Sequence, residues 1–195
     1  MLVWLAGFLT QFYHGFAVFQ YLTLRAILGA LTALIIAFVF GPYMIRRLRS
    51  YKVRQVVRDD GPASHLSKAG TPTMGGLLIL IALSVSTLLW SDLSNGFVWS
   101  VLLVTAGFGV IGFGDDYLKL THRSSKGLSG KLKFIAQIAI ALVATYAIVK
   151  LSGPETGTGL AIPFVKDMLI DLGWFFFVFA VIVMVGASNA VNLTD

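Results

Sequence analysis

Residues 26–45 read AILGALTALIIAFVFGPYMI, a stretch without a charged side chain. A helix of roughly 20 apolar residues spans the hydrocarbon core of a bilayer, which is about 30 Å thick. Further apolar segments follow at 73–91, 97–114, 134–149 and 172–190. The composition agrees, because 57% of the 195 residues are hydrophobic and only 12% are charged. We therefore predict an all-α integral membrane protein with five transmembrane helices in a single membrane domain.

The first 24 residues are also uncharged, but they are interrupted by polar groups, among them Gln11, His14 and Gln20. An interfacial helix is therefore expected here rather than a sixth span. A secretory signal peptide is not expected, because it would begin with basic residues and the first charge is Arg25. The 195 residues contain no cysteine, so disulfides, thiolate metal sites and a cysteine nucleophile are excluded for them.

Basic residues are concentrated in two places. Of the 15 Lys and Arg residues, seven follow the first apolar segment and five follow the third. Short cytoplasmic loops carry the excess of basic residues, which predicts a periplasmic N-terminus and a cytosolic residue 195. Most of these basic residues are expected only to set this topology and to contact anionic lipid. Nucleic-acid binding is not expected, because the basic loops lack the interleaved aromatic residues of a single-strand binding surface.

The second apolar segment is preceded by RDDGPASHLSKAGTPTMGG, residues 58–76. Thr71 and Pro72 fit an N-cap and the first position of a helix. A helix beginning there would direct backbone N–H groups and the positive end of its dipole toward the cytosol beside Lys68, which favours phosphate binding. The alternative is an ordinary capped helix with a basic flank.

Two adjacent carboxylates, Asp115 and Asp116, end the third segment and are followed by Lys119. An aspartate at the centre of a membrane helix costs about 2.5–3.5 kcal/mol, and less near the surface, so the pair calls for compensation. Magnesium is a suitable partner, because it binds through one or two carboxylates and shares its other positions with water and phosphates. The alternative is a solvated helix end in which the acids pair with Lys119.

Polar residues also recur every third position at the end of the chain, as Asn189, Asn192 and Asp195. On a continuous helix they form one stripe, which could reach a hard cation or the hydroxyls of a sugar or nucleoside. A lone asparagine in such a helix more often makes a hydrogen bond to another helix. Together the three clusters suggest a phosphorylated cytosolic ligand, a lipid partner and phosphoryl transfer, which needs mainly positioning and charge neutralisation.

Three motifs carry a resemblance to a known family: the 58–76 stretch, GFGDDYLK at 112–119 and NAVNLTD at 189–195. They resemble the phospho-N-acetylmuramoyl-pentapeptide transferases, which belong to the polyprenyl-phosphate N-acetylhexosamine-1-phosphate transferase superfamily. The resemblance implies transfer of phospho-N-acetylmuramoyl-pentapeptide from its UDP-linked donor to undecaprenyl phosphate, giving lipid I and UMP. It also implies dependence on Mg²⁺ and a homodimer in the bacterial inner membrane with a cytosolic active face.

Carried over by motif, the resemblance implies roles for individual residues. Asp115 and Asp116 would be the active-site aspartates, with Asp115 the first choice for activating the lipid phosphate. Asp116 and Asn192 would be metal ligands. The implied substrate-binding residues are Lys68, Thr73, Lys119, Asn189, Asn192 and Asp195, with Asn189 in a supporting position. His65 would be pocket wall or loop scaffold.

Members of the family have about ten spans, a further essential aspartate and a histidine-rich loop after the position of residue 195. Residues 1–195 are therefore expected to form the N-terminal half of such a transferase and to be inactive alone. Two alternatives stay open. One is a polyprenyl-phosphate N-acetylglucosamine-1-phosphate transferase, and the other is a non-enzymatic channel or transporter subunit that binds ions.

Overall fold

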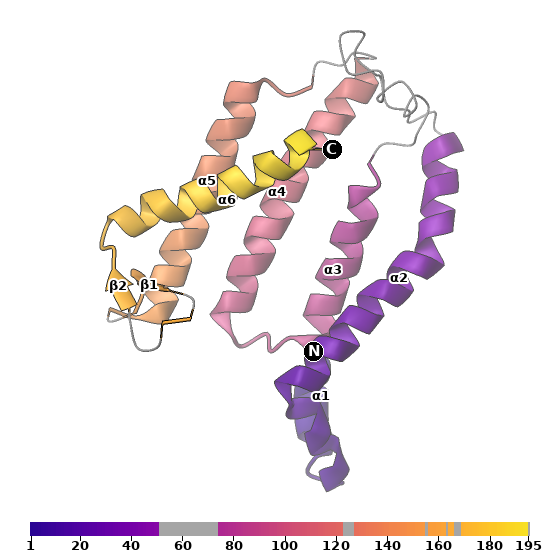
Figure 1. The fold of residues 1–195 in the computed structure, drawn as a ribbon. Coiled ribbons are helices and arrows are strands. Elements are labelled where there is room, and N and C mark those ends of the chain that lie inside the picture. Colours follow the sequence, from indigo (N-terminus) through magenta and orange to yellow (C-terminus); the bar gives the residue numbers. More distant parts are fainter. Residues whose placement is uncertain (51–73, 123–126, 155, 163, 166–168, 195) are drawn as a thin grey trace. The chain divides into compact units, whose positions relative to one another are not determined.

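The computed structural model of the chain describes residues 1–50, 74–122, 127–154, 156–162, 164–165 and 169–194 (Figure 1). Within these residues the protein is mostly helical. The helices are α1 (Leu2–Leu9), the short 3-10 helix η1 (His14–Gln20), α2 (Leu22–Ser50), α3 (Gly76–Trp90), α4 (Gly96–Thr121), α5 (Gly130–Ser152) and α6 (Phe175–Thr194). A hairpin of β1 (Gly159–Ala161) and β2 (Leu169–Asp171) separates α5 from α6.

Three of the helices are long and apolar enough to cross a membrane, namely residues Leu22–Leu48 of α2, α4 and α5. They contain the predicted spans 26–45, 97–114 and 134–149. The spans predicted at 73–91 and 172–190 coincide with the shorter apolar stretches Gly76–Trp90 and Phe175–Ala190. Large apolar side chains such as Phe38, Val110 and Ile135 are exposed along the helices, as lipid-facing residues are. The architecture is that of a helical membrane protein, and the crossing by all five segments stays a prediction.

The N-terminal residues form no helix long enough to span. Helix α1 has eight residues and is about 12 Å long, less than half of the hydrocarbon thickness. Residues 11–13 separate it from η1, and Trp4 and Phe12 are about three-quarters exposed. The first 21 residues thus contain only these two short helices, and both their interfacial location and the number of spans stay predictions.

Helix α3 begins later than its sequence indicates. Its N-cap is Gly75, and Met74 just before it has a φ of 70°. A right-handed helix cannot pass through a residue with this backbone, so the expectation that Pro72 opens the helix is wrong. Thr71 and Pro72 themselves lie outside the described residues. The turn at Met74–Gly75, and not the Thr71–Pro72 pair, decides where the helix starts.

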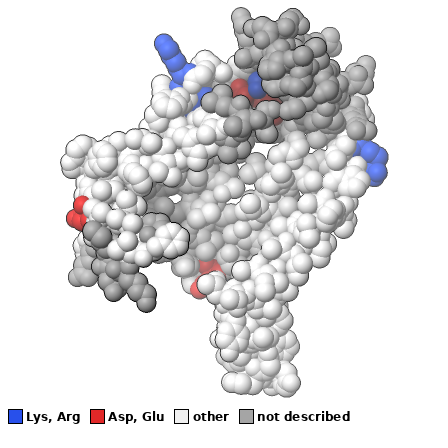
Figure 2. Space-filling view, viewed as in Figure 1, with Lys and Arg blue, Asp and Glu red and all other residues white. Residues whose placement is uncertain are grey.

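By their contacts the residues form two compact units: 1–98 with 112–128, and 99–111 with 129–195. In the first unit α2 and α3 lie side by side (Figure 1). The hydroxyl of Ser86 donates to the carbonyl of Gly29 at 2.7 Å, and the indole N–H of Trp90 donates to the Thr32 hydroxyl at 2.8 Å. Basic atoms lie at one end of α2, and the rest of its visible surface carries no charge (Figure 2).

The second unit is held together by the packing of α5 on α6. Ala141 and Ala144 of α5 and Val185 of α6 are buried. Small side chains of this kind let membrane helices approach closely, which strengthens dispersion contacts where no hydrophobic driving force acts between helices.

The hairpin was not expected from the sequence, which suggested helices alone. It pairs Gly159 with Asp171 and Ala161 with Leu169 in antiparallel register. Gly159 lies so close to Leu169 that a Cβ at this position would collide with the Leu169 side chain. The hairpin forms because the chain leaves α5 at Gly153, with a φ of 82°, and the following backbone groups pair with each other, while the fold stays mostly helical as predicted.

The Asp171 carboxylate ties the hairpin to its flanks. It accepts hydrogen bonds from the Thr158 hydroxyl at 2.6 Å and from the Gly173 N–H at 2.9 Å, and these bonds hold the pKa of Asp171 below its ordinary value of 3.8. A lowered carboxyl pKa stabilises the fold above pH 3.8, and this contribution disappears as pH falls through the lowered value.

We expect Thr158→Val to raise the pKa of Asp171 toward 3.8 without changing the hairpin at neutral pH. The shift can be measured by NMR titration of ¹³C-labelled aspartate. Thr156→Val is the matched control, because its hydroxyl donates to the Ser152 carbonyl instead. An unchanged Asp171 titration in Thr158→Val would contradict the assignment.

Candidate active site

The C-terminal end of α4 brings three of the predicted site residues together. Asn95 caps the other end of the helix by accepting a hydrogen bond from the Phe97 N–H. Helical geometry then places Lys119 one turn after Asp115 and Asp116, because residues three and four apart are neighbours on a helix. The ammonium of Lys119 lies 2.7 Å from Asp115 Oδ2 and 3.7 Å from Asp116 Oδ1.

Asp115 is fixed by donors on both of its oxygens. Oδ2 accepts from Lys119, and Oδ1 accepts from the backbone N–H of Leu128 at 2.9 Å. Its side chain is only 14% exposed. Asp115 therefore joins the end of α4 to the segment that leads into α5, and its orientation is determined by the fold.

Gly127 is essential to this connection for a steric reason. A Cβ at this position would overlap Asp115 Oδ1 and would lie 2.9 Å from both the Asp115 carboxyl carbon and Lys119 Cε. These distances are shorter than ordinary contacts, so a larger residue at position 127 would have to displace the ends of the Asp115 and Lys119 side chains.

Asp116 is in a different environment. Its side chain is 32% exposed and that of Lys119 is 38% exposed, more than twice the value for Asp115. Neighbouring helical residues point about 100° apart, so the two acids need not share one task. The geometry makes Asp115 the positioned anchor and Asp116 the more accessible oxygen donor.

The residues fit a magnesium site in part. Mg²⁺ takes one or two protein carboxylates and fills its remaining positions with water and phosphate oxygens, and adjacent Asp115 and Asp116 match this donor set. Within the described residues there is no cluster of three or more His, Cys, Asp or Glu side chains. Within the described residues, the protein ligands for such a site are therefore these two adjacent carboxylates.

The asparagine stripe is helical as far as the structure describes it. Helix α6 continues to Thr194, so Asn189 and Asn192 share one face. The Asn189 amide donates to Gln137 Oε1 of α5 and to the Val185 carbonyl, both at 2.8 Å. Asn189 thus makes an interhelical hydrogen bond, which is the usual structural role of a lone asparagine in a membrane helix. Its substrate-binding role stays a prediction.

The other predicted site residues cannot be located. Lys68, Thr73, Asp195 and His65 lie outside the described residues, and for Asn192 only the backbone is described. Their roles in binding substrate or metal remain predictions.

Sequence reasoning missed Gly127, Leu128 and Gln137. Gly127 and Leu128 lie in a loop where no pattern marks a contact with Asp115. Gln137 gave a usable signal, because it is an amide inside an apolar segment and such a group needs a partner. In the structure it is 4% exposed and bonded to Asn189.

We expect Asn189 and Gln137 to be coupled in stability. Replacing either one by leucine leaves the other amide buried with one partner fewer, whereas replacing both removes the polar pair. Interhelical hydrogen bonds in membranes are worth on average about 0.6 kcal/mol and at most about 1.7 kcal/mol. A double-mutant cycle measured by unfolding in detergent should give a coupling in this range. Strictly additive effects would contradict the contact.

Comparison with known proteins agrees with the motifs. The model described as "Glycosyl transferase family 4" matches residues 98–195, and the model described as "Phospho-N-acetylmuramoyl-pentapeptide-transferase signature 1" matches residues 68–80. The chain is similar to the phospho-N-acetylmuramoyl-pentapeptide-transferase of Syntrophus aciditrophicus (strain SB), with 54% identity over 183 residues. This alignment covers 94% of the chain and 50% of the relative, so the chain spans about half the length of that protein. With the family model covering residues 98–195, the chain belongs to glycosyl transferase family 4.

Proposed function

We propose that these residues form the N-terminal part of a phosphoglycosyl transferase that makes lipid I for peptidoglycan. An oxygen of undecaprenyl phosphate would attack the sugar-linked phosphorus of UDP-N-acetylmuramoyl-pentapeptide. The new phosphorus–oxygen bond joins the lipid phosphate to the sugar phosphate, and the bond to UMP breaks. The products are lipid I and UMP.

One observation supports this function best: the 54% identity to a phospho-N-acetylmuramoyl-pentapeptide-transferase over 94% of the chain. The transferase signature matches residues 68–80, and the family model over residues 98–195 covers Asp115, Asp116 and Lys119. Phosphoryl transfer of this kind depends mainly on positioning and on neutralising charge. A channel subunit would not require the signature of a transferase.

The geometry of the Asp115, Asp116 and Lys119 cluster suggests a different role for each side chain. The Lys119 ammonium, which is 38% exposed beside both acids, can pair with a phosphate oxygen while Asp115 holds it in place. Asp116 is more exposed than Asp115 and is the better candidate for contact with the metal or the phosphates. Asp115, first choice for activating the lipid phosphate, already accepts two hydrogen bonds and so serves better as the group that orients Lys119.

Mg²⁺ would be held by Asp116, with Asn192 as a further ligand, and would neutralise charge on the phosphates when bound. Lys68, Thr73, Asn189 and Asp195 would complete the substrate pocket. Further ligands are expected from residues after 195, and the activity is proposed for the full-length protein.

The test is release of UMP by purified full-length protein supplied with undecaprenyl phosphate and one UDP-sugar at a time. We expect release with UDP-N-acetylmuramoyl-pentapeptide and none with UDP-N-acetylglucosamine. Release with UDP-N-acetylglucosamine alone would overturn the proposal in favour of the related N-acetylglucosamine-1-phosphate transferases.

We also propose that five segments cross the bacterial inner membrane, that the Asp115 cluster faces the cytosol and that the full-length protein is a homodimer. The distribution of Lys and Arg supports the orientation. Residues 1–195 lack cysteine, so Ser50→Cys and Ser94→Cys each introduce a single cysteine into this part of the chain, and any cysteine elsewhere in the full-length protein is first replaced by serine. In intact spheroplasts, an impermeant maleimide should label position 94 and not position 50. The reverse pattern would invert the topology.

A further inference from the structure

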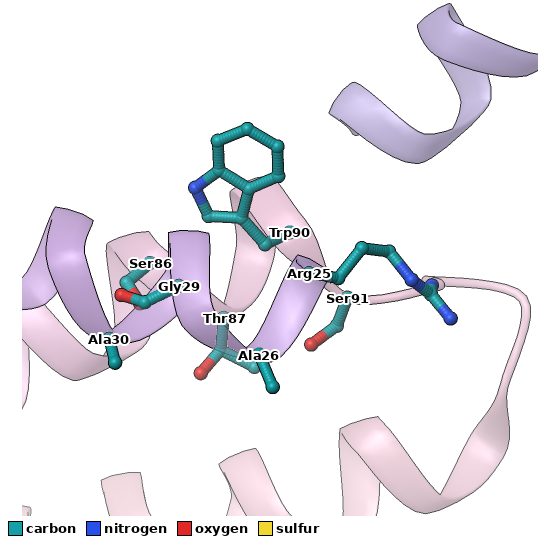
Figure 3. A pocket seen from close by; sticks show the side chains of 8 residues that line it. All are labelled: Arg25, Ala26, Gly29, Ala30, Ser86, Thr87, Trp90 and Ser91. Carbon is teal, nitrogen blue, oxygen red and sulfur yellow. The ribbon is translucent and has the colours of Figure 1, made fainter. Parts of the chain in front are cut away.

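A polar cavity lies between the first residues of α2 and the last residues of α3 (Figure 3). Its volume is about 250 Å³, several times the roughly 30 Å³ occupied by one water molecule. The cavity is lined by Arg25, Ala26, Gly29, Ala30, Ser86, Thr87, Trp90 and Ser91. Half of these side chains are polar, which is unusual between two otherwise apolar membrane helices.

Arg25 gives the cavity its charge. Its Nε is buried and has no hydrogen-bond partner, the one such side-chain atom in the part of the chain that the structure describes. Leaving a buried charged donor unsatisfied costs more than the roughly 1–3 kcal/mol of a neutral one. Arg25 also lines the cavity, so an anion bound there would lie beside the positive charge of its guanidinium.

Asp92 is an acidic residue whose charge acts on Arg25, and one of its carboxylate oxygens already has two donors. Asp92 Oδ1 accepts hydrogen bonds from the Ser94 N–H at 3.0 Å and the Ser94 hydroxyl at 2.7 Å. These bonds are the main cause of the lowered pKa of Asp92, and the charge of Arg25 is a smaller one. Asp92 therefore interacts with Arg25 through its charge, and no hydrogen bond joins the two side chains.

The surroundings indicate which anion this is. Trp90 lines the cavity at the last residue of α3, where aromatic rings favour the membrane–water boundary. Ile27 and Leu31 of α2 are 57% and 48% exposed, which provides an apolar surface for acyl chains. A guanidinium at the boundary, beside the hydroxyl side chains of Thr87 and Ser91, suits a phosphate group.

We propose that this cavity binds the phosphate group of an anionic membrane lipid, with Arg25 as the cation and Thr87 and Ser91 as hydroxyl partners. The site is separate from the Asp115 cluster. Helix α4 begins at Gly96, shortly after Ser91, and Asp115 lies about 28 Å further along it. With the predicted orientation, the lipid belongs to the outer leaflet.

The test measures lipids retained by purified full-length protein in native mass spectrometry after exchange into phosphatidylglycerol or phosphatidylcholine. Loss of the charged hydrogen bonds in Arg25→Gln should weaken binding of phosphatidylglycerol by at least about 10-fold. Ala30→Leu, which fills the cavity without changing charge, should also weaken it. Lys150→Gln is the matched control, since it removes a cation from α5 that lies over the Tyr146 ring.

Retention of phosphatidylglycerol by folded Arg25→Gln at the wild-type level would overturn the proposal. If Arg25→Gln does not fold, an unchanged Ala30→Leu would overturn it. Equal retention of phosphatidylcholine would show that the negative charge is not recognised, and displacement of phosphatidylglycerol by millimolar inorganic phosphate would show a site for free anions instead of a lipid. None of these outcomes depends on transferase activity, so the proposed function can fail separately.

Discussion

Replacing Asp116 by asparagine is expected to reduce UMP release by the full-length protein by at least about 100-fold. The change keeps the size of the side chain and removes its negative charge. The Asp116 side chain is 32% exposed at the end of α4. Loss of its negative charge should therefore weaken its interaction with the metal or the phosphates more than it disturbs packing. The turnover number should fall more than the apparent affinity for the UDP-linked donor.

Asp92→Asn is the matched control, because it makes the same substitution outside the cluster, in the connection between α3 and α4. It should leave transfer within about twofold of wild type, as a surface substitution away from a site normally does. A transfer rate in Asp116→Asn equal to that of the control would remove Asp116 from the active site. A change in ion flux in its place would support the channel hypothesis.

The second large effect is expected at Gly127. Alanine there would force the Asp115 carboxylate away from the Leu128 N–H, because the new Cβ would overlap Asp115 Oδ1. Lys119 would lose its fixed acceptor, and a displacement of about 1 Å near reacting groups can cost about 100-fold in rate. We expect this loss with the fold retained, since Gly127 lies in the loop between α4 and α5.

Gly130→Ala provides the comparison, because the space next to Gly130 is open. It should fold and transfer like wild type. Circular dichroism and the melting temperature separate misfolding from misplacement. An active Gly127→Ala would show that Asp115 need not be held in this position.

Much of the fold could be predicted because membrane helices are set mainly by runs of apolar residues. The runs at 26–45, 97–114 and 134–149 each fall within a helix long enough to span. The helix ends were harder to predict. Arg25 lies inside α2, since a long basic side chain at a helix end can extend toward the interface, and Met74 delays α3 by a backbone turn that residue types do not reveal.

The site was predictable where neighbours in sequence are neighbours in space. Asp115, Asp116 and Lys119 lie within one turn of helix, so their proximity follows from α4 alone. The contact of Asp115 with Leu128 and that of Asn189 with Gln137 join positions 13 and 52 residues apart. Such contacts depend on how segments pack, which single-residue patterns do not encode.

The length of α2 has a consequence for the bilayer around it. Its 29 residues measure about 43 Å, well above the hydrocarbon thickness of about 30 Å. Pro42 lies inside the helix and interrupts its hydrogen bonds, and the ribbon of α2 is visibly bent (Figure 1). A helix longer than its membrane responds by tilting or bending. Helix α2 can therefore match bilayers of different thickness by pivoting at Pro42, while its hydrogen bonds to α3, at Gly29 and Thr32, stay intact on the other side of the pivot.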